Sequence, residues 1–430
     1  MSIQLYIYRF FIWVAGPLID LYLLSRRQKG KEDEERFSER LGITKISRPE
    51  GIIVWIHAAS VGESISVLPL VNLLLESNKN TNILFTTGTV TSAKILQKRL
   101  PKRVIHQFVP VDKYITVKRF LEHWKPDIAL WVESELWPNL IIESQKSGCK
   151  MIQVNARISE DSRRTWQRAK KLIQRMLECF SLSLAQSQQD ADRLKELGAK
   201  NTKYIGNLKY DAPPLPTDPK EAGQILKAIG ERQFWVAAST HKGEEEIIFS
   251  IHRKLREKQP DLLTIIIPRH PNRSKEIAED IRQKDSLINI AIRSEGEEIK
   301  KDTEIYIADT MGELGIFYRL ANIVFIGGSL VDHGGQNPLE AARLECAIIS
   351  GPHTHNFSEI YREMKYERAY LEVSDEEELY STVSRLFSNH EEVLGLARRA
   401  QEIVESKQGI VKKYLEEIKP FLNQVGEKKK

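Results

Sequence analysis

Residues 52–63 read Ile-Ile-Val-Trp-Ile-His-Ala-Ala-Ser-Val-Gly-Glu, and they are the clearest guide to the fold class. The first five residues are all apolar and rich in β-branched side chains, which is typical of a strand buried on both faces of a parallel sheet. A turn containing Ser60 and the pair Gly62-Glu63 follow, and an amphipathic helical pattern continues to Leu75. The stretch therefore predicts a strand, a tight turn and a helix, the opening of a βαβ unit.

Apolar runs of the same kind recur along the N-terminal half. They cover residues 83–85, 128–132 and 151–154, and helical patterns follow the first two at 92–100 and 137–143. Short apolar strands that alternate with helices predict a parallel sheet covered by helices on both faces.

Four prolines interrupt this alternation between Asp211 and Pro219, which makes the stretch the best candidate for a linker. The alternation then restarts, with apolar runs at 234–238, 263–267, 305–307, 323–326 and 347–349. Residues 235–244 repeat the strand, Ser-containing turn and Gly-Glu of residues 55–63. The sequence thus predicts two Rossmann-like α/β domains, with ligands bound in a central cleft where the carboxyl ends of the strands meet.

The N-terminal segment has a different composition. Residues 3–24 are almost all aliphatic or aromatic, interrupted by Gln4, Arg9, Pro17 and Asp20. A helix of about 20 apolar residues crosses a bilayer, so residues 1–25 are predicted to form a membrane anchor, and the cations between residues 26 and 31 place the rest of the chain in the cytoplasm. No small-residue cleavage site follows, which argues against a signal peptide. Because Arg9 and Asp20 are charged, a helix that lies in the membrane interface remains an open alternative.

Composition excludes several other classes. The chain has 430 residues, 41% of them hydrophobic and 29% charged, and a net charge of +5. Its length favours two domains, and so mild a charge argues against nucleic acid as a partner. The three cysteines, Cys149, Cys179 and Cys346, show no metal-ligand spacing and are predicted to be buried thiols. The histidines form no HxxxH or HExxH pair, so neither a metal nor a cofactor is predicted.

Ser60-Val61-Gly62-Glu63 has two interpretations. The Ser-x-x-Glu spacing is that of a capping box, in which Ser60 caps the helix and Glu63 bonds back, and the pattern alone favours this structural role. The turn also follows the first strand of the first domain, where a carboxylate ionised by the helix N-terminus would face the cleft and serve as a general base.

A glycine-rich loop marks the second domain. Gly327-Gly328-Ser329 follows a strand, and Gly334-Gly335 leads to Asn337 and Pro338, which predict a helix start. Free backbone N–H groups at such a start suit a phosphate, and Glu340 suits ribose hydroxyls. The alternative roles are a tight turn for the glycines and charge complementation of the helix end for Glu340.

Two further sets of cations are candidates. Arg269, in the turn Pro268-Arg269-His270-Pro271 after a strand, is suited to bind phosphate oxygens, although an exposed turn with incidental charge is the alternative. The basic stretch 163–175 is usually explained as a solvated helix face. With Trp166 in it and an anchor in the same domain, docking to anionic lipid is a second hypothesis.

These motifs together resemble the 3-deoxy-D-manno-octulosonic acid (Kdo) transferases of lipid A biosynthesis. The resemblance runs from the anchor to about residue 425 and rests on segments 57–63, 133–140, 155–157, 206–209, 268–271, 309–314, 327–330, 334–340 and 351–354. One minor departure is Gln336, where the family often has histidine.

The resemblance implies a GT-B fold and inverting, metal-independent transfer of Kdo from CMP-Kdo to lipid IV-A at the cytoplasmic face of the inner membrane. It implies that Glu63 is the general base. It also implies that the donor is bound by Arg269, Gly327, Gly328, Asn337 and Glu340. The expected organisation is an anchor at 1–25, an acceptor domain at 26–210, a linker at 211–219, a CMP-Kdo-binding domain at 220–405, and a C-terminal helix and basic tail at 406–430.

Two other functions stay open on the sequence. One is a different GT-B nucleotide-sugar enzyme, such as another lipid glycosyltransferase or an epimerase. The other is a non-catalytic, membrane-tethered binder of nucleotide sugars. The number of Kdo units added does not follow from any motif.

Overall fold

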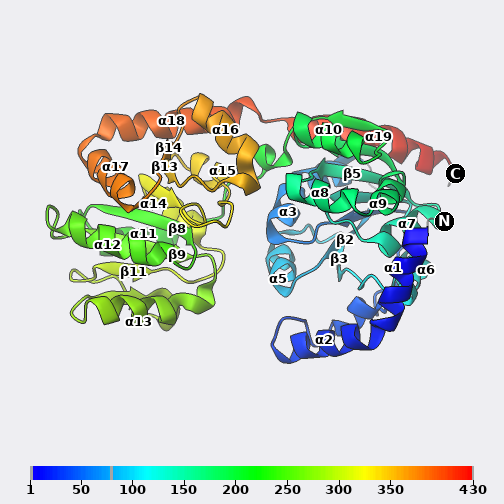
Figure 1. Cartoon of the computed structure of the whole chain (residues 1–430), viewed down its shortest axis with the longest axis horizontal. Helices are drawn as coiled ribbons and strands as arrows, with labels where there is room; N and C mark the ends of the chain where they lie inside the picture. Colours follow the sequence, from blue (N-terminus) through cyan, green and yellow to red (C-terminus); the bar gives the residue numbers. More distant parts are fainter. Residues whose placement is uncertain (1–2, 78–80, 429–430) are drawn as a thin grey trace. The chain divides into compact units, whose positions relative to one another are not determined.

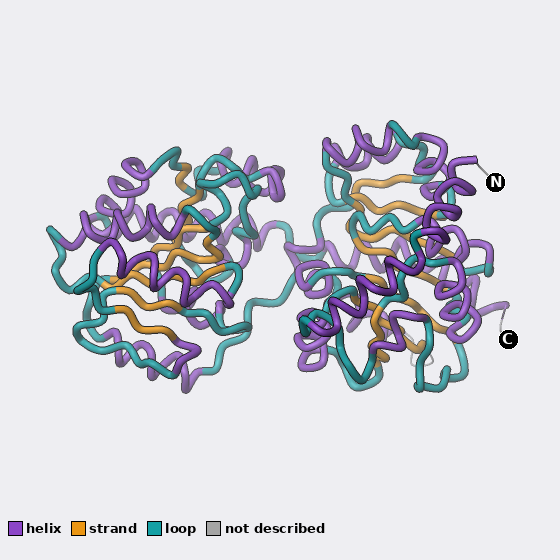
Figure 2. The backbone as a smooth tube through the Cα atoms, turned by 60° about the horizontal axis from the view of Figure 1, so that its bottom comes forward, coloured by secondary structure: helices purple, strands orange, loops and turns teal. Residues whose placement is uncertain are grey.

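The computed structural model describes residues 3–77 and 81–428. The chain forms two compact units, residues 1–212 with 408–430 and residues 213–407. Each unit is a parallel sheet with helices on both faces (Figures 1 and 2). The predicted pair of doubly wound α/β domains is therefore confirmed.

The sheet of the N-terminal unit has seven parallel strands in the order β3-β2-β1-β4-β5-β6-β7. Its strands are β1 (Ile52–His57), β2 (Thr81–Thr87), β3 (Val104–Phe108), β4 (Ile128–Val132), β5 (Lys150–Ala156), β6 (Phe180–Ala185) and β7 (Thr202–Tyr204). Its helices after β1 are α3 (Val61–Ser66), α4 (Leu68–Ser77), α5 (Val90–Arg99), α6 (Tyr114–Trp124), α7 (Pro138–Lys146), α8 (Glu160–Gln167), α9 (Lys170–Leu177) and α10 (Gln188–Glu196). The strand order reverses at β1, where α/β folds of this kind bind ligands.

The sheet of the C-terminal unit also has seven parallel strands, in the order β10-β11-β9-β8-β12-β13-β14. They are β8 (Phe234–Thr240), β9 (Leu263–Pro268), β10 (Ile290–Ile292), β11 (Ile305–Ile307), β12 (Ile323–Ile326), β13 (Ala347–Ser350) and β14 (Leu371–Glu372). The helices are α11 (Pro219–Ile229), α12 (Glu244–Arg256), α13 (Ser274–Lys284), α14 (Leu314–Leu320), α15 (Leu339–Ala342), α16 (Ser358–Tyr366), α17 (Glu376–Ser388) and α18 (His390–Ser406).

The first strand of each unit is built alike, as the repeated sequence suggested. Trp55 on β1 is fully buried and donates from Nε1 to Thr86 Oγ1 on the next strand at 2.8 Å. Trp235 on β8 is equally buried and donates to Thr264 Oγ1 at 2.9 Å. In both units the indole packs in the core and its one polar atom is satisfied across the sheet.

The three cysteines are buried free thiols, as predicted, and lie at Cys149, Cys179 and Cys346. The predicted basic helix 163–175 is instead two short helices, α8 and α9. Glu160 in the first turn of α8 binds both Arg163 and Arg164, so part of the basic charge is neutralised locally.

The C-terminal helix α19 (Ile410–Lys428) packs on the N-terminal unit. Asp211 accepts hydrogen bonds from the backbone N–H groups of Gly409 and Val411, at 2.7 and 2.5 Å. Tyr414 is fully buried and donates to Gly206 O at 2.9 Å. Residues 429–430 of the predicted basic tail lie outside the described residues.

The prediction that residues 3–24 form one continuous anchor helix is wrong. The segment forms two helices, α1 (Ile3–Val14) and α2 (Gly16–Gln28), with a bend of 58°. The break comes at Ala15, because Pro17 in the first turn of α2 lacks an N–H group and its ring excludes the preceding turn of helix. Among the described residues no single helix is long and apolar enough to cross a membrane; the bent pair meets that test only by combined length and composition.

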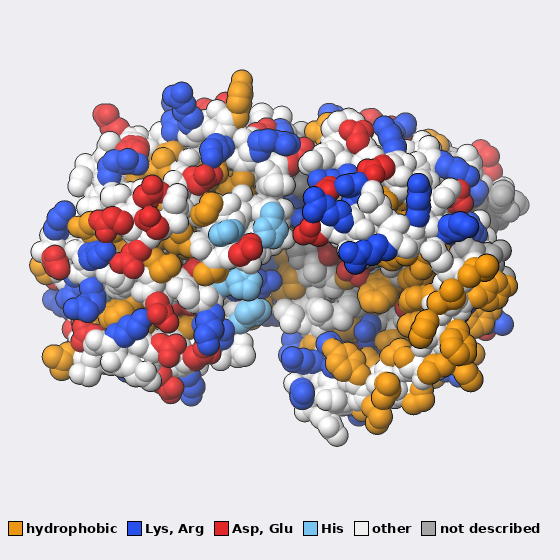
Figure 3. Space-filling view, in the orientation of Figure 1, with side chains coloured by type: hydrophobic (Ala, Val, Ile, Leu, Met, Phe, Trp, Pro, Cys, Tyr) orange, Lys and Arg blue, Asp and Glu red, His pale blue; other side chains and the backbone are white. Residues whose placement is uncertain are grey.

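The polar side chains of α1 bind the N-terminal unit. Gln4 Oε1 accepts from Leu172 N at 2.8 Å, Tyr8 donates to Asp112 at 2.7 Å, and Arg9 pairs with Glu143 at 2.5 Å. The apolar side chains on the remaining surface of α1 and α2 are exposed and form a continuous orange band in Figure 3. They are Ile3, Tyr6, Ile7, Phe10, Phe11, Trp13, Val14, Leu18, Leu21, Tyr22 and Leu24.

Candidate active site

Glu63 lies in the first turn of α3, directly after β1, and carries out the predicted capping. Ser60 is the N-cap, and its Oγ accepts from Glu63 N at 3.3 Å. Glu63 Oε1 accepts from Ser60 Oγ at 2.9 Å, while Oε2 accepts from Ala59 N at 2.8 Å, one residue before the N-cap. These bonds hold the carboxyl group of Glu63 beside the C-terminal ends of the strands. The side chain is only partly buried.

Two more carboxyl groups lie near Glu63, in the turn after β4. Burial and the charges of Glu133 and Glu135 raise the pKa of Glu63 to about 7. The raised pKa is opposite to the expectation that the helix N-terminus keeps Glu63 ionised, because desolvation and like charge outweigh the effect of the helix end. A carboxyl group that titrates near neutral pH is well matched to proton transfer at that pH.

The backbone of this edge is strained at two residues that are not glycine. Glu133 has a φ of 56° and Asn155, at the end of β5, has a φ of 53°. Strained residues of this kind cluster at functional sites. Asn155 Oδ1 accepts from Leu208 N at 2.9 Å, and Lys209 Nζ donates to Glu133 Oε1 at 2.5 Å. Glu133 is buried and Lys209 is partly buried, so Lys209 compensates the charge of Glu133.

Neither Lys209 nor Asn155 was predicted as a site residue. Both lie in segments used for the family resemblance. The local sequence pattern cannot predict a positive φ at a residue other than glycine, nor an ion pair between residues 76 positions apart. The signal available was their place in the segments 155–157 and 206–209 of the family resemblance.

The donor-site candidates lie in the C-terminal unit, where the ends of β9 and β12 flank β8. Arg269 follows β9, is exposed, and donates from its backbone N–H group to Thr240 O at 3.0 Å. Gly327 follows β12 and donates to Ala238 O at 2.8 Å. A side chain at Gly327 would lie 2.6 Å from Ser239 O, so glycine is required for the close approach of the two strand ends.

Three histidines gather beside Arg269 and were not predicted as site residues. The rings of His241 and His333 are stacked, with centroids 4.3 Å apart, and His270 lies 5.9 Å from His241. Burial, the other two histidines and Arg269 lower the pKa of His241 to about 4, so its ring is neutral at pH 7. Histidine side chains are visible on this face in pale blue (Figure 3).

The helix that follows the glycine-rich loop is shorter than predicted. Asn337 Oδ1 accepts from Leu339 N at 3.2 Å, but the N-cap is Pro338 rather than the predicted Asn337, and α15 is a single turn of four residues. A single turn supplies only a weak dipole, so the N-terminus of α15 attracts a phosphate much less than the predicted longer helix would. Glu340 is half-buried in that turn.

Comparison with known proteins decides the family. A family model described as "3-Deoxy-D-manno-octulosonic-acid transferase (kdotransferase)" matches residues 35–212, and one for "Glycosyl transferases group 1" matches residues 231–403. The 3-deoxy-D-manno-octulosonic acid transferase of Rickettsia bellii is 36% identical over 96% of this chain and 99% of its own length. That of Haemophilus influenzae is 34% identical over 97% of this chain and 98% of its own length. The chain belongs to the Kdo transferase family.

The fold of this Kdo transferase family member is shared with more distant proteins. MnaA of S. aureus, solved with UDP, has a TM-score of 0.60 at 16% identity and covers 86% of this chain and 97% of its own. A UDP-GlcNAc 2-epimerase from Neisseria meningitidis has a TM-score of 0.58 at 13% identity and covers 83% of this chain and 99% of its own. These likenesses support the GT-B fold only.

Among residues 3–77 and 81–428, no group of three or more His, Cys, Asp or Glu side chains is arranged to hold a metal ion. Metal-independent transfer stays a prediction from the family resemblance.

Proposed function

We propose that this glycosyltransferase moves Kdo from CMP-Kdo to lipid IV-A, with inversion at the anomeric carbon and with Glu63 as the general base. Family membership supports Kdo transfer. The observation that carries the assignment of the base is the partly exposed Glu63 carboxyl, which is fixed by Ser60 and Ala59 and whose pKa burial raises to about 7.

Glu63 is suited to accept the proton that the acceptor hydroxyl must lose. A primary hydroxyl of the acceptor must lose its proton as it attacks the anomeric carbon, and a carboxylate at hydrogen-bond distance accepts it. A pKa near 7 makes Glu63 a better proton acceptor than an ordinary carboxylate, while a substantial fraction remains ionised at pH 7. The two bonds from Ser60 and Ala59 orient the group before the substrate binds.

On the leaving side, negative charge develops on the CMP phosphate as the bond to Kdo breaks. The exposed guanidinium of Arg269 is suited to bind that phosphate in a bidentate manner. The neighbouring His241 and His270 are suited to donate hydrogen bonds to anionic oxygens of the donor. Asn337 and Glu340 would contact the nucleotide, and Gly327 and Gly328 would allow its close approach, as the family resemblance implies.

We also infer that the enzyme acts at the cytoplasmic face of the inner membrane and that α1 and α2 lie in the membrane interface. The polar side chains of α1 bind the protein, and Lys113 holds Asp20 of α2 at 2.5 Å, so what remains outward is apolar. An amphipathic pair of this kind inserts its apolar face among lipid headgroups. The exposed cations Arg168, Lys170 and Lys171, next to and at the start of α9, would add attraction to anionic lipid.

The function is tested by incubating the purified full-length chain with lipid IV-A and one donor at a time. Mass spectrometry of the lipid product should show the addition of one or more Kdo residues with CMP-Kdo and no product with UDP-N-acetylglucosamine or UDP-glucose. A product formed only from a UDP-sugar would establish a different GT-B enzyme, and binding of CMP-Kdo without any product would establish a non-catalytic binder.

A further inference from the structure

Two consecutive glutamates, Glu244 and Glu245, open α12 directly after β8. Both are buried, with exposed fractions of 0% and 4%, which is rare for a carboxyl group that has no partner. Neither belongs to the donor-binding set that the family resemblance implies. Their contacts show what each one holds in place.

Glu244 binds the turn that follows β12. Its two oxygens accept from the backbone N–H groups of Gly328, Ser329 and Leu330, at 2.7, 3.0 and 3.0 Å. A fourth bond comes from His241 N at 2.9 Å. Successive backbone N–H groups that converge in this way form an anion-binding nest. Here the protein's own carboxylate occupies the nest, so these N–H groups are not available to a phosphate of the donor.

The turn held by Glu244 supports the rest of the glycine-rich loop. Gly335 N donates to Gly328 O at 2.7 Å, which links the turn to the segment that carries Gln336 and Asn337. Gln336 Nε2 in turn lies 3.3 Å from His241 Nε2. A displaced turn would therefore shift Asn337 and the histidines together.

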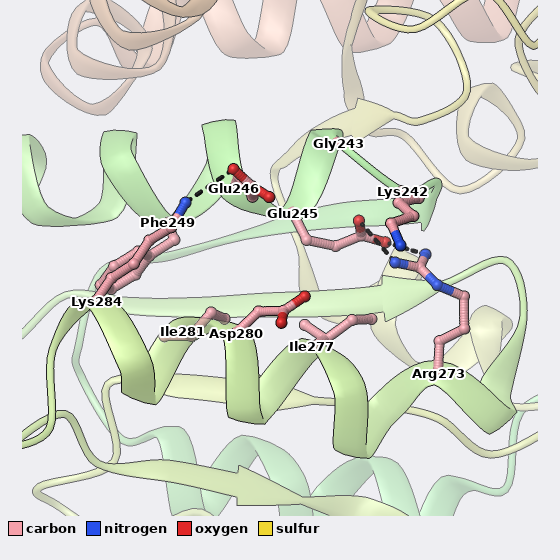
Figure 4. Close-up of a pocket in the computed structure, with 10 residues that line it drawn as sticks. All are labelled: Lys242, Gly243, Glu245, Glu246, Phe249, Arg273, Ile277, Asp280, Ile281 and Lys284. Carbon is pink, nitrogen blue, oxygen red and sulfur yellow. Dashed lines mark hydrogen bonds and ion pairs between the residues drawn. The ribbon is translucent and has the colours of Figure 1, made fainter.

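Glu245 braces the loop on the other side of β8. It accepts from Arg273 Nη1 at 2.8 Å and from Thr240 Oγ1 at 3.0 Å. Figure 4 shows this contact between α12 and the turn before α13, with Lys284 bound to Glu246 at the far end. Arg273 lies four residues after Arg269, so the pair fixes the loop that presents Arg269.

Glu244 differs from Glu63 in its hydrogen-bond partners and in the charges near it. Glu63 and Glu244 both follow a glycine at the start of the helix after the first strand of a unit. Burial raises the pKa of each, but four backbone N–H groups oppose the shift at Glu244, whereas Glu133 and Glu135 add to it at Glu63. The turn after the first strand thus holds a carboxyl group bonded to four backbone N–H groups in the C-terminal unit and one bonded to Ser60 Oγ and Ala59 N in the N-terminal unit.

We propose that Glu244 is a positioning residue for donor binding, which acts by holding the turn Gly328–Leu330 and His241 in the conformation that receives the nucleotide. The proposal rests on the proposed function, because it takes the C-terminal unit to bind CMP-Kdo. It assigns Glu244 no contact with substrate.

The test compares Glu244→Gln with Glu246→Gln in the full-length protein. Glu246 lies on the same helix and pairs with Lys284 at the surface, so its variant controls for loss of one charge from α12. Backbone hydrogen exchange of residues 328–330 should become faster in Glu244→Gln and stay unchanged in the control, because an amide side chain cannot accept all three N–H groups. The Kd for CMP, measured by calorimetry, and the KM for CMP-Kdo should both rise by about tenfold or more, with kcat changed by less than about threefold.

Several outcomes overturn the proposal. They are unchanged exchange at 328–330, faster exchange with an unchanged Kd for CMP, and a selective loss of kcat. If Glu244→Gln does not fold, Glu244→Asp decides, since it keeps the charge but is one methylene too short to reach all partners; wild-type affinity in that variant overturns the proposal, and intermediate affinity supports it. If the wild-type protein does not bind CMP, the proposed function fails, while the exchange result still tests the bracing of the turn.

Discussion

At the residue scale, Glu63 makes the predicted capping bonds and also has the properties that the proposed general base requires, two roles that the sequence presented as alternatives. The capping geometry is present, yet the same carboxyl is partly exposed and its pKa is raised to about 7. The local spacing was enough to predict the cap. It was not enough to predict the pKa, which depends on Glu133 and Glu135, about 70 positions away in the chain.

The pKa of Glu63 predicts how the rate depends on pH. A general base must be deprotonated, so kcat/KM should rise with pH and level off above about 7. Glu135→Gln removes a negative charge near Glu63 and should move the midpoint of that rise to lower pH, by up to about one unit. The measurement is a pH profile of kcat/KM for CMP-Kdo between pH 5 and pH 9.

Glu76→Gln serves as the control for that profile, because Glu76 is an exposed glutamate of the same unit on α4. Its midpoint should match that of the wild-type protein. A midpoint that stays in place in Glu135→Gln, or moves to higher pH, would contradict the electrostatic account of Glu63.

At the scale of elements, the N-terminal segment shows what composition predicts and what it does not. Composition correctly identified residues 3–24 as apolar. It could not show that Pro17 divides the segment into two helices, or that Gln4, Tyr8 and Arg9 bind the protein, because those contacts involve α7, α9 and the loop before α6. The structure thus strengthens the interfacial alternative.

The exposed aromatic residues of α1 should anchor the protein to lipid. The combined change Phe10→Ser, Phe11→Ser and Trp13→Ser removes three large exposed side chains and should lower binding to vesicles by about tenfold or more. The measurement is co-sedimentation with vesicles of phosphatidylethanolamine and phosphatidylglycerol.

A matched control replaces three exposed apolar residues of the C-terminal unit, Leu287, Tyr366 and Leu394, with serine. This variant should bind vesicles as the wild-type protein does. Equal loss of binding in both variants, or no loss in the first, would argue against α1 as the docking element.

At the scale of the whole molecule, the division into two units was partly visible in the sequence. The proline-rich stretch 211–219 lies at the first boundary, after residue 212. The family resemblance implied a separate C-terminal helix from residue 406, but it did not imply the return of α19 to the N-terminal unit, which depends on long-range contacts such as those of Asp211 and Tyr414. The donor residues were predicted as separate motifs, whereas the bracing by Glu244 requires backbone groups more than 80 positions away.

The return of α19 predicts a large effect of a single core substitution. Tyr414 is fully buried and donates to Gly206 O, so Tyr414→Ala should lower the free energy of unfolding by about 3–5 kcal/mol. Tyr366→Ala, at a tyrosine that is 84% exposed, should change it by less than about 0.5 kcal/mol. Urea denaturation measures both, and similar values for the two variants would show that α19 does not contribute to the core.

The most direct test of the central claim is the turnover of Glu63→Gln with CMP-Kdo and lipid IV-A. Glutamine can keep the bond from Ala59 but cannot accept a proton, so kcat should fall by about 10²- to 10⁴-fold while the variant stays folded and its Kd for CMP is unchanged. If Glu63 serves only as a cap, the variant should instead lose about 1 kcal/mol of stability and keep its turnover. A folded Glu63→Gln protein that binds CMP and transfers Kdo at nearly the wild-type rate would contradict the assignment of Glu63 as the base.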